Sequence, residues 1–234
     1  MLNIMNHSIK KTVLAMDTAL GGVSVGIMAS NGHIVSRIIE TAREQAVILV
    51  PTIQEVVREA EIEFSDIDLI VCNRGPGSFT GLRIGLATAR TMALTLDKPI
   101  IGLNTLNTMA RHYSTEEPLL IVLETKRQDF YARYYDAQGE PLTEPFAVDA
   151  EEVLNRAPVD SFNVGGDCLE RFQECVSGNF KCLDNLTQPD PILMAQYGLK
   201  LFEEQGEQGT PQPLYLRGAD VSYPKNPPRK LAKV

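Results

Sequence analysis

Residues 74–85 of the chain read RGPGSFTGLRIG, a glycine-rich stretch that decides the fold. They follow an apolar run at residues 68–72, which is typical of a buried strand, and they lead into a long apolar segment. Glycines allow the tight turn that such a junction needs, and Ser78 or Thr80 can cap a helix that begins there. The stretch therefore predicts a strand, a glycine turn and a helix over residues 79–96.

The start of this helix could bind an anion, because free backbone N–H groups and the positive end of the helix dipole lie there. The stretch lacks the Gly-Lys-Ser/Thr sequence of a P-loop and the spacing of the dinucleotide-binding fingerprint. A tight turn followed by a capped helix explains the same residues without any ligand.

The expected helix has two largely apolar faces. One face holds Leu82, Leu86, Ala89, Ala93 and Leu96, and the other holds Gly81, Ile84, Gly85, Thr88 and Met92. A helix that is apolar over most of its circumference is buried on two sides. The first face suits the helix's own sheet. The second is covered either by another chain or by the chain's own third helix, expected over residues 104–113.

Alternating strands and helices are expected along the rest of the chain. Residues 12–17, 22–29 and 33–39 form three antiparallel strands, and residues 44–60 form a helix. A polar segment at residues 114–118 is the best boundary, because strand and helix patterns start again after it.

This boundary divides the chain into three parts. An N-terminal α/β lobe spans residues 1–113, and a smaller C-terminal α/β lobe spans residues 114–209. Residues 210–234 form a proline-rich basic tail, expected to be extended or partly disordered, because they hold five prolines and no sustained periodicity.

Length and composition fit an ordinary globular protein. Of the 234 residues, 44% are hydrophobic and 22% charged, and no apolar run is long enough to span a membrane. The first residues lack the apolar run of a signal peptide. The four cysteines include no CxxC pair, so we expect free thiols, with Cys72 buried, in the reducing cytoplasm.

Asp17 and Thr18 end the first expected strand, beside a Gly-Gly turn. A carboxylate in this place can hold a hydrated metal or orient a nucleotide, although spacing alone favours a local Asx turn. The three histidines form no metal-binding pair, and the sequence contains no nucleophile elbow. Considered one at a time, these residues do not identify a chemical reaction.

Taken together, they resemble the bacterial TsaB family, also called YeaZ. The glycine stretch at residues 75–85 carries the resemblance, and LAMDTA at 14–19, PIIGLNTL at 99–106 and PLYLR at 213–217 agree with it. The resemblance covers nearly the whole chain, at modest identity outside residues 12–106.

The resemblance implies a two-lobed α/β fold of the actin, hexokinase and Hsp70 (ASKHA) type, with a mixed sheet flanked by helices in each lobe. It also implies a non-catalytic role in making N6-threonylcarbamoyladenosine (t6A) beside the anticodon of tRNA. Family members pair with a transferase, TsaD, are joined by an ATPase, TsaE, and form homodimers when alone. The contact lies on the N-terminal lobe and centres on the helix after the glycine stretch, which makes its second apolar face the expected interface.

Two departures bear on the chemistry that the resemblance implies. TsaD binds its metal partly through a histidine pair on a helix, whereas residues 43–51 hold no histidine and Gln45 stands where TsaB proteins often have one. Nucleotide-binding members of the superfamily use an Asp-Gly loop where this chain has Glu124 and no glycine. No metal or cofactor is expected, and weak nucleotide binding would use a partial site of Asp17, Thr18, Gly165 and Gly166.

A different class of function stays open, namely a degenerate enzyme of this fold: a weak ATPase or a glycoprotease-like peptidase. The lack of metal ligands and of a nucleophile–base pair speaks against the peptidase. ATP turnover abolished by Asp17→Ala, or proteolysis lost with a chelator, would favour the enzyme.

The net charge of −8 is unevenly distributed. Residues 217–234 hold five basic residues and one acidic residue, a net charge of +4, which leaves −12 for residues 1–216. An acidic body is a poor surface for RNA. We therefore expect tRNA contact only indirectly or through the basic tail, although such tails are often merely solvated.

Overall fold

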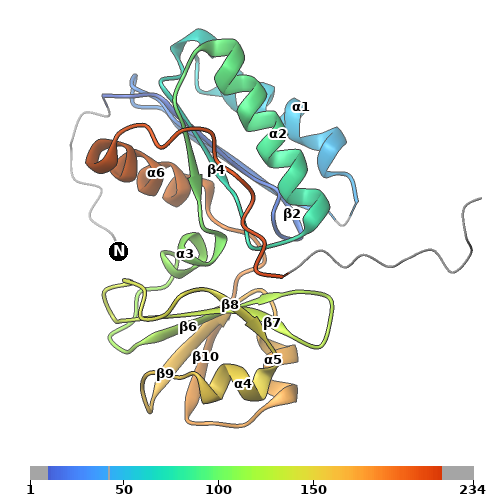
Figure 1. The fold of residues 1–234 in the computed structure, drawn as a ribbon. Coiled ribbons are helices and arrows are strands. Elements are labelled where there is room, and N and C mark those ends of the chain that lie inside the picture. Colours follow the sequence, from blue (N-terminus) through green and yellow to red (C-terminus); the bar gives the residue numbers. More distant parts are fainter. Residues whose placement is uncertain (1–9, 42, 218–234) are drawn as a thin grey trace, which may run out of the picture.

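A computed structural model describes residues 10–41 and 43–217. The chain folds into two lobes, each built on a five-stranded sheet, and Figure 1 shows one lobe above the other.

The first sheet has the strand order β3-β2-β1-β4-β5. Antiparallel pairing joins β1 to β2 and β2 to β3, and β4 and β5 continue the sheet parallel to β1. The strands are β1 (Val13–Asp17), β2 (Gly22–Met28), β3 (Ile34–Glu40), β4 (Leu69–Asn73) and β5 (Ile100–Leu103).

Helices cover both faces of this sheet. The helices α1 (Gln45–Glu59) and α2 (Phe79–Leu96) lie side by side on one face, where they pack on Met16 and Val25 (Figure 1). The helix α6 (Pro191–Gln205) packs on the opposite face. A short 3-10 helix, η1 (Phe64–Asp66), leads into β4.

The second sheet has the order β10-β9-β6-β7-β8. Its strands are β6 (Leu119–Glu124), β7 (Phe130–Tyr135), β8 (Phe146–Val148), β9 (Phe162–Gly166) and β10 (Phe180–Asn185). β6, β9 and β10 are parallel, and β7 and β8 pair antiparallel.

Alternation along β6 buries both faces of the second sheet. Leu120 and Val122 pack in the core that includes residues of α4 (Ala150–Asn155) and α5 (Leu169–Cys175). Leu119 and Ile121 pack against α3 (Thr105–Ala110), which lies between the two sheets (Figure 1). The core around α3 therefore joins the lobes.

The structure confirms the expected fold class, the meander and the helix over residues 79–96, which Ser78 caps by accepting a hydrogen bond from Gly81 N at 3.3 Å. The strands β8 and β10 were not expected, because one is very short and the other, at the edge of the sheet, mixes polar and apolar residues.

One placement differs from the expected division of the chain. Helix α6 falls within residues 114–209 but covers the first sheet, because that sheet has a second apolar face to bury. Met194 and Ala195 pack there, and Gly198 approaches Val71 closely. The division at residues 114–118 otherwise stays a prediction.

Residues 210–217, here called the closing strap, are the described part of the expected proline-rich tail, and they lie against the glycine turn and α2 without forming a helix or strand (Figure 1). Leu214 N donates to the Arg74 carbonyl at 2.6 Å, and Arg90 Nε donates to the Pro211 carbonyl at 3.0 Å. Arg217 then forms an ion pair with Asp129 of the second lobe. The remainder of the expected tail, residues 218–234, lies outside the described residues.

Replacing Leu214 by proline is expected to lower the free energy of unfolding by about 1–2 kcal/mol, because proline cannot donate to the Arg74 carbonyl. Urea denaturation measures the change. Leu216→Pro is the matched control, because Leu216 N donates no backbone hydrogen bond within the described part of the strap. Equal losses in the two variants would show that this hydrogen bond does not anchor the strap.

Candidate functional site

The end of β1 rests on the glycine turn and on the first turns of α2. Thr18 Oγ1 donates to the Gly81 carbonyl at 2.7 Å, and Ser78 N donates to the Ala19 carbonyl at 2.7 Å. A side chain at Gly77 would meet the backbone of Ala19. The glycines are thus needed because two backbone segments touch, with no room left for a Cβ atom.

This close approach corrects part of the expected interface. Gly81 and Gly85 are buried within the chain: a Cβ atom on Gly81 would overlap the Thr18 carbonyl, and one on Gly85 would lie 2.6 Å from Thr18 Oγ1. They therefore cannot form a surface for another chain. Ile84, Thr88 and Met92 remain partly exposed, and Ile84 and Met92 border the core shared with α1.

The cover beside α2 also differs from the expected alternative. We expected either another chain or the helix over residues 104–113. In the structure the neighbour of α2 is α1, and α3 lies instead between the two sheets. Sequence periodicity identified an apolar face but could not identify which helix lies beside it.

Asp17 is buried at the end of β1, with 1% of its surface exposed. Both carboxylate oxygens accept hydrogen bonds within the chain, from Asn73 Nδ2 at 2.9 Å and from Ala19 N at 3.1 Å. Thr108 Oγ1 in turn donates to Asn73 Oδ1 at 2.7 Å. Burial raises the pKa of Asp17 to about 6, against the lowering effect of these hydrogen bonds. The local turn expected for this residue is present, as part of a buried polar network.

Asp17 makes folding stability depend on pH. Its pKa rises from an ordinary value of 3.8 to about 6 on folding, so the folded chain holds this proton more tightly than the unfolded chain. The free energy of unfolding therefore falls as the pH rises from about 4 to about 6, by on the order of 3 kcal/mol from this group.

Asp17→Asn is expected to remove this part of the pH dependence, because the asparagine side chain does not titrate. Urea denaturation between pH 4 and pH 7 measures it, and Asp160→Asn, at an exposed position, is the control. An unchanged slope in Asp17→Asn would contradict the assignment.

The expected glycine pair of the nucleotide site is covered from within the chain. The ring of Tyr113 lies against Gly165, where a Cβ atom would be 2.6 Å from Tyr113 Cζ. Gly166 N donates to Tyr113 Oη at 3.0 Å, and Tyr113 Oη donates to the Asp184 carbonyl at 2.8 Å. The partial site thus consists of Asp17 and Thr18 in one lobe and Gly165 and Gly166 in the other, and all four are engaged internally.

A cavity of about 380 Å³ lies at the carboxyl ends of β6 and β9. Glu124 and Asp167 line it, and Glu124 N donates to Asp167 Oδ1 at 2.7 Å. Arg171 Nη1 donates to Glu124 Oε1 at 2.6 Å, and burial raises the pKa of Asp167 to about 6. This is where α/β sheets commonly bind ligands. Sequence reasoning missed Arg171 and Tyr113, because neither belongs to a motif.

The outer side of α1 and α2 carries exposed apolar side chains. Val47 and Val50 on α1 are 75% and 48% exposed, and Leu94 on α2 is 85% exposed. We call these residues, with the partly exposed Ile84, Thr88 and Met92, the α1–α2 surface. Val47 and Val50 lie near the start of α1 and Leu94 lies near the end of α2, so these exposed apolar side chains are spread along the two helices.

Other expected features can be placed. Cys72 is a buried free thiol, as expected, and burial together with the neighbouring Asp17 raises its pKa to about 12. Within residues 10–41 and 43–217, no group of three or more His, Cys, Asp or Glu side chains could hold a metal ion. No helix of the described chain has the length and apolar character needed to cross a membrane.

The fold defines a class: a two-lobed α/β protein with a mixed five-stranded sheet, flanked by helices, in each lobe. Residues 30–160 match the family model of TsaD, tRNA N6-adenosine threonylcarbamoyltransferase. This match spans more than half of the chain, and the chain belongs to that family.

Individual relatives agree with this assignment. An uncharacterized protein of Mycobacterium tuberculosis is 35% identical over 218 residues, which cover 90% of this chain and 93% of that protein. The Escherichia coli tRNA threonylcarbamoyladenosine biosynthesis protein TsaB is 36% identical over 99 residues, 42% of each chain. The structure of YeaZ from Pseudomonas aeruginosa matches with a TM-score of 0.77 at 22% identity, over 88% of this chain and 100% of that one. The expected resemblance to TsaB and YeaZ is confirmed.

Proposed function

We propose that this chain takes part in the synthesis of t6A in tRNA, in the cytoplasm, as a non-catalytic partner of a TsaD-type transferase. Family membership is the observation that carries the proposal, together with the similarity to Escherichia coli TsaB, whose name places that protein in t6A biosynthesis. That similarity covers less than half of the TsaB chain, so the partner and the role of this chain are part of the proposal.

The internal contacts of the candidate site favour a partner over a catalyst. Asp17 and Thr18 use their polar atoms to hold β1 against Asn73 and α2. Tyr113 covers the glycine pair on which a bound nucleotide would depend. A residue whose donors and acceptors are already satisfied by the fold is a poor candidate for handling a substrate.

The α1–α2 surface is the proposed contact with the transferase. Val47 and Leu94 expose most of their apolar side chains to water in the isolated chain. A partner that covers them removes this apolar surface from water, and burial of apolar surface drives association. The same surface would support self-association when the partner is absent, because exposed apolar side chains of two copies can cover each other and leave water. A TsaE-type ATPase would then join the pair.

Co-purification with the TsaD protein of the same organism tests this proposal. Tagged chain is expected to retain TsaD through gel filtration as a single complex. In the same preparations, ATP turnover and proteolysis above those of the buffer control are expected to be absent. A chain that elutes without TsaD at micromolar concentrations, or that alone turns over ATP, would contradict the proposal.

A further inference from the structure

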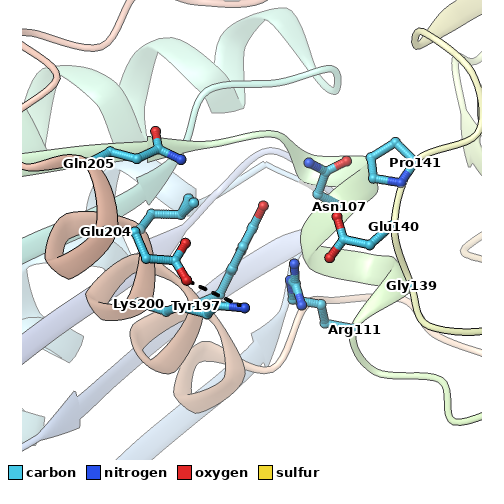
Figure 2. A pocket seen from close by; sticks show the side chains of 10 residues that line it. Asn107, Arg111, Gly139, Glu140, Pro141, Tyr197, Lys200, Glu204 and Gln205 are labelled. Atoms are coloured by element: carbon cyan, nitrogen blue, oxygen red, sulfur yellow. Dashed lines mark ion pairs between the residues drawn. The ribbon is translucent and has the colours of Figure 1, made fainter.

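A cavity of about 230 Å³ lies between the two lobes, apart from the site described above. Figure 2 shows side chains of α6 on one side of it, and α3 with the turn that follows β7 on the other. Tyr197, Lys200 and Glu204 share one face of α6, because they are three and four residues apart. The lining therefore combines side chains from both lobes.

Arg111 brings an unpaired positive charge to this cavity. Its guanidinium group lies over the ring of Tyr197, with Cζ 3.7 Å from the ring centroid. Its Nε is buried and has no hydrogen-bond partner, and Arg111 forms no ion pair within the described chain. A partly buried guanidinium without a counter-ion is unfavourable, and its planar fork matches a carboxylate.

Glu140 brings the opposite charge from the other lobe. It lines the cavity but forms no ion pair with Arg111. The remaining two charges balance each other, because Lys200 Nζ lies 3.7 Å from Glu204 Oε1 on the same helix. Among the described residues, Arg111 and Glu140 are therefore the two charges of the lining without an ion pair, and both face a shared space (Figure 2).

Asn107 adds an oriented donor beside Arg111. Its Oδ1 accepts hydrogen bonds from Arg133 Nη1 at 3.0 Å and from Tyr135 Oη at 2.9 Å. These bonds fix the amide and leave Nδ2 to donate toward the cavity, which Asn107 lines.

From this arrangement we infer that the cavity binds a small zwitterion of the α-amino-acid type. The carboxylate lies on Arg111 and Asn107, and the ammonium group lies on Glu140. At about 230 Å³ the cavity is smaller than the sites that hold drug-sized molecules, which argues against a nucleotide or a peptide. Because both lobes contribute, a bound zwitterion would link them through its two ends.

Titration calorimetry on the isolated full chain tests this inference without TsaD or tRNA, so its outcome is independent of the proposed function. The probes are L-threonine and L-alanine, with acetate and ethylammonium as half-ligands. We expect the amino acids to bind with a dissociation constant on the order of 1 mM or tighter, and each half-ligand to bind at least about tenfold more weakly. Absence of amino-acid binding, or acetate binding as tightly as alanine, would overturn the inference.

Two variants locate the site. Arg111→Met and Glu140→Gln are each expected to weaken amino-acid binding about tenfold, because each removes one charge-assisted contact. Glu144→Gln, at a nearby exposed position outside the cavity lining, is the control and should bind as the unaltered chain does. Glu140 lies on an exposed turn, so its variant keeps the test decisive even where Arg111→Met unfolds. Unchanged affinity in Glu140→Gln would overturn the inference.

Discussion

Gly81→Ala is expected to lower the free energy of unfolding by about 3 kcal/mol, although alanine is the better helix former by about 1 kcal/mol. The added Cβ atom would overlap the Thr18 carbonyl, where the end of β1 touches α2. Both partners of this contact are backbone, so neither can move without shifting the strand or the helix. Chemical denaturation of the purified variant measures the loss.

Gly21→Ala is the matched control for this change. Apart from its neighbours in the chain, the nearest atom to a Cβ atom on Gly21 would be Gln188 Nε2, at 4.0 Å. The control is expected to stay within about 0.5 kcal/mol of the unaltered chain. A Gly81→Ala variant as stable as this control would show that close packing is not the reason for the glycine.

The double variant Val47→Glu and Leu94→Glu is expected to weaken binding to TsaD by about a hundredfold or more. It places two carboxylates on the α1–α2 surface, where they would be buried without partners in the complex. Both side chains are at least 75% exposed in the isolated chain, so folding stability should change little. Calorimetry or surface plasmon resonance measures the affinity, and circular dichroism verifies the fold.

Leu142→Glu tests whether the effect belongs to the surface or to added charge. Leu142 is also an exposed apolar residue, 42% exposed, but it lies in the second lobe. Its variant should bind TsaD as the unaltered chain does. If the double variant binds equally well, the contact with the transferase lies elsewhere on the molecule.

The glycine stretch shows how far the sequence predicts this fold. Strand, turn, cap and helix over residues 69–96 follow from local rules that involve only neighbours in the chain, and all are present. The position of α6 did not follow, because its own periodicity cannot say which of two sheets it covers. The strand β10 was missed because its pattern is mixed and only its parallel pairing with β9 defines it.

The candidate site was predictable to a smaller extent for a similar reason. The sequence shows Asp17 as a polar residue at a strand end. It does not show that Asn73, 56 residues away, is its hydrogen-bond partner. Gly81 and Gly85 were assigned to an outer face because helical spacing does not reveal that Thr18 lies against them. Val47 falls at helical spacing with the buried Ile53 and Val57, yet it is 75% exposed, which only the packed structure shows.

The amount of t6A formed in tRNA is the most direct test of the account. Purified TsaD and TsaE, with tRNA, ATP and threonylcarbamoyl-adenylate, are assayed with and without this chain. We predict that t6A accumulates with the chain, and falls to background both without it and with the Val47→Glu and Leu94→Glu variant. Equal t6A formation in the absence of the chain would contradict its role as a required partner of the transferase.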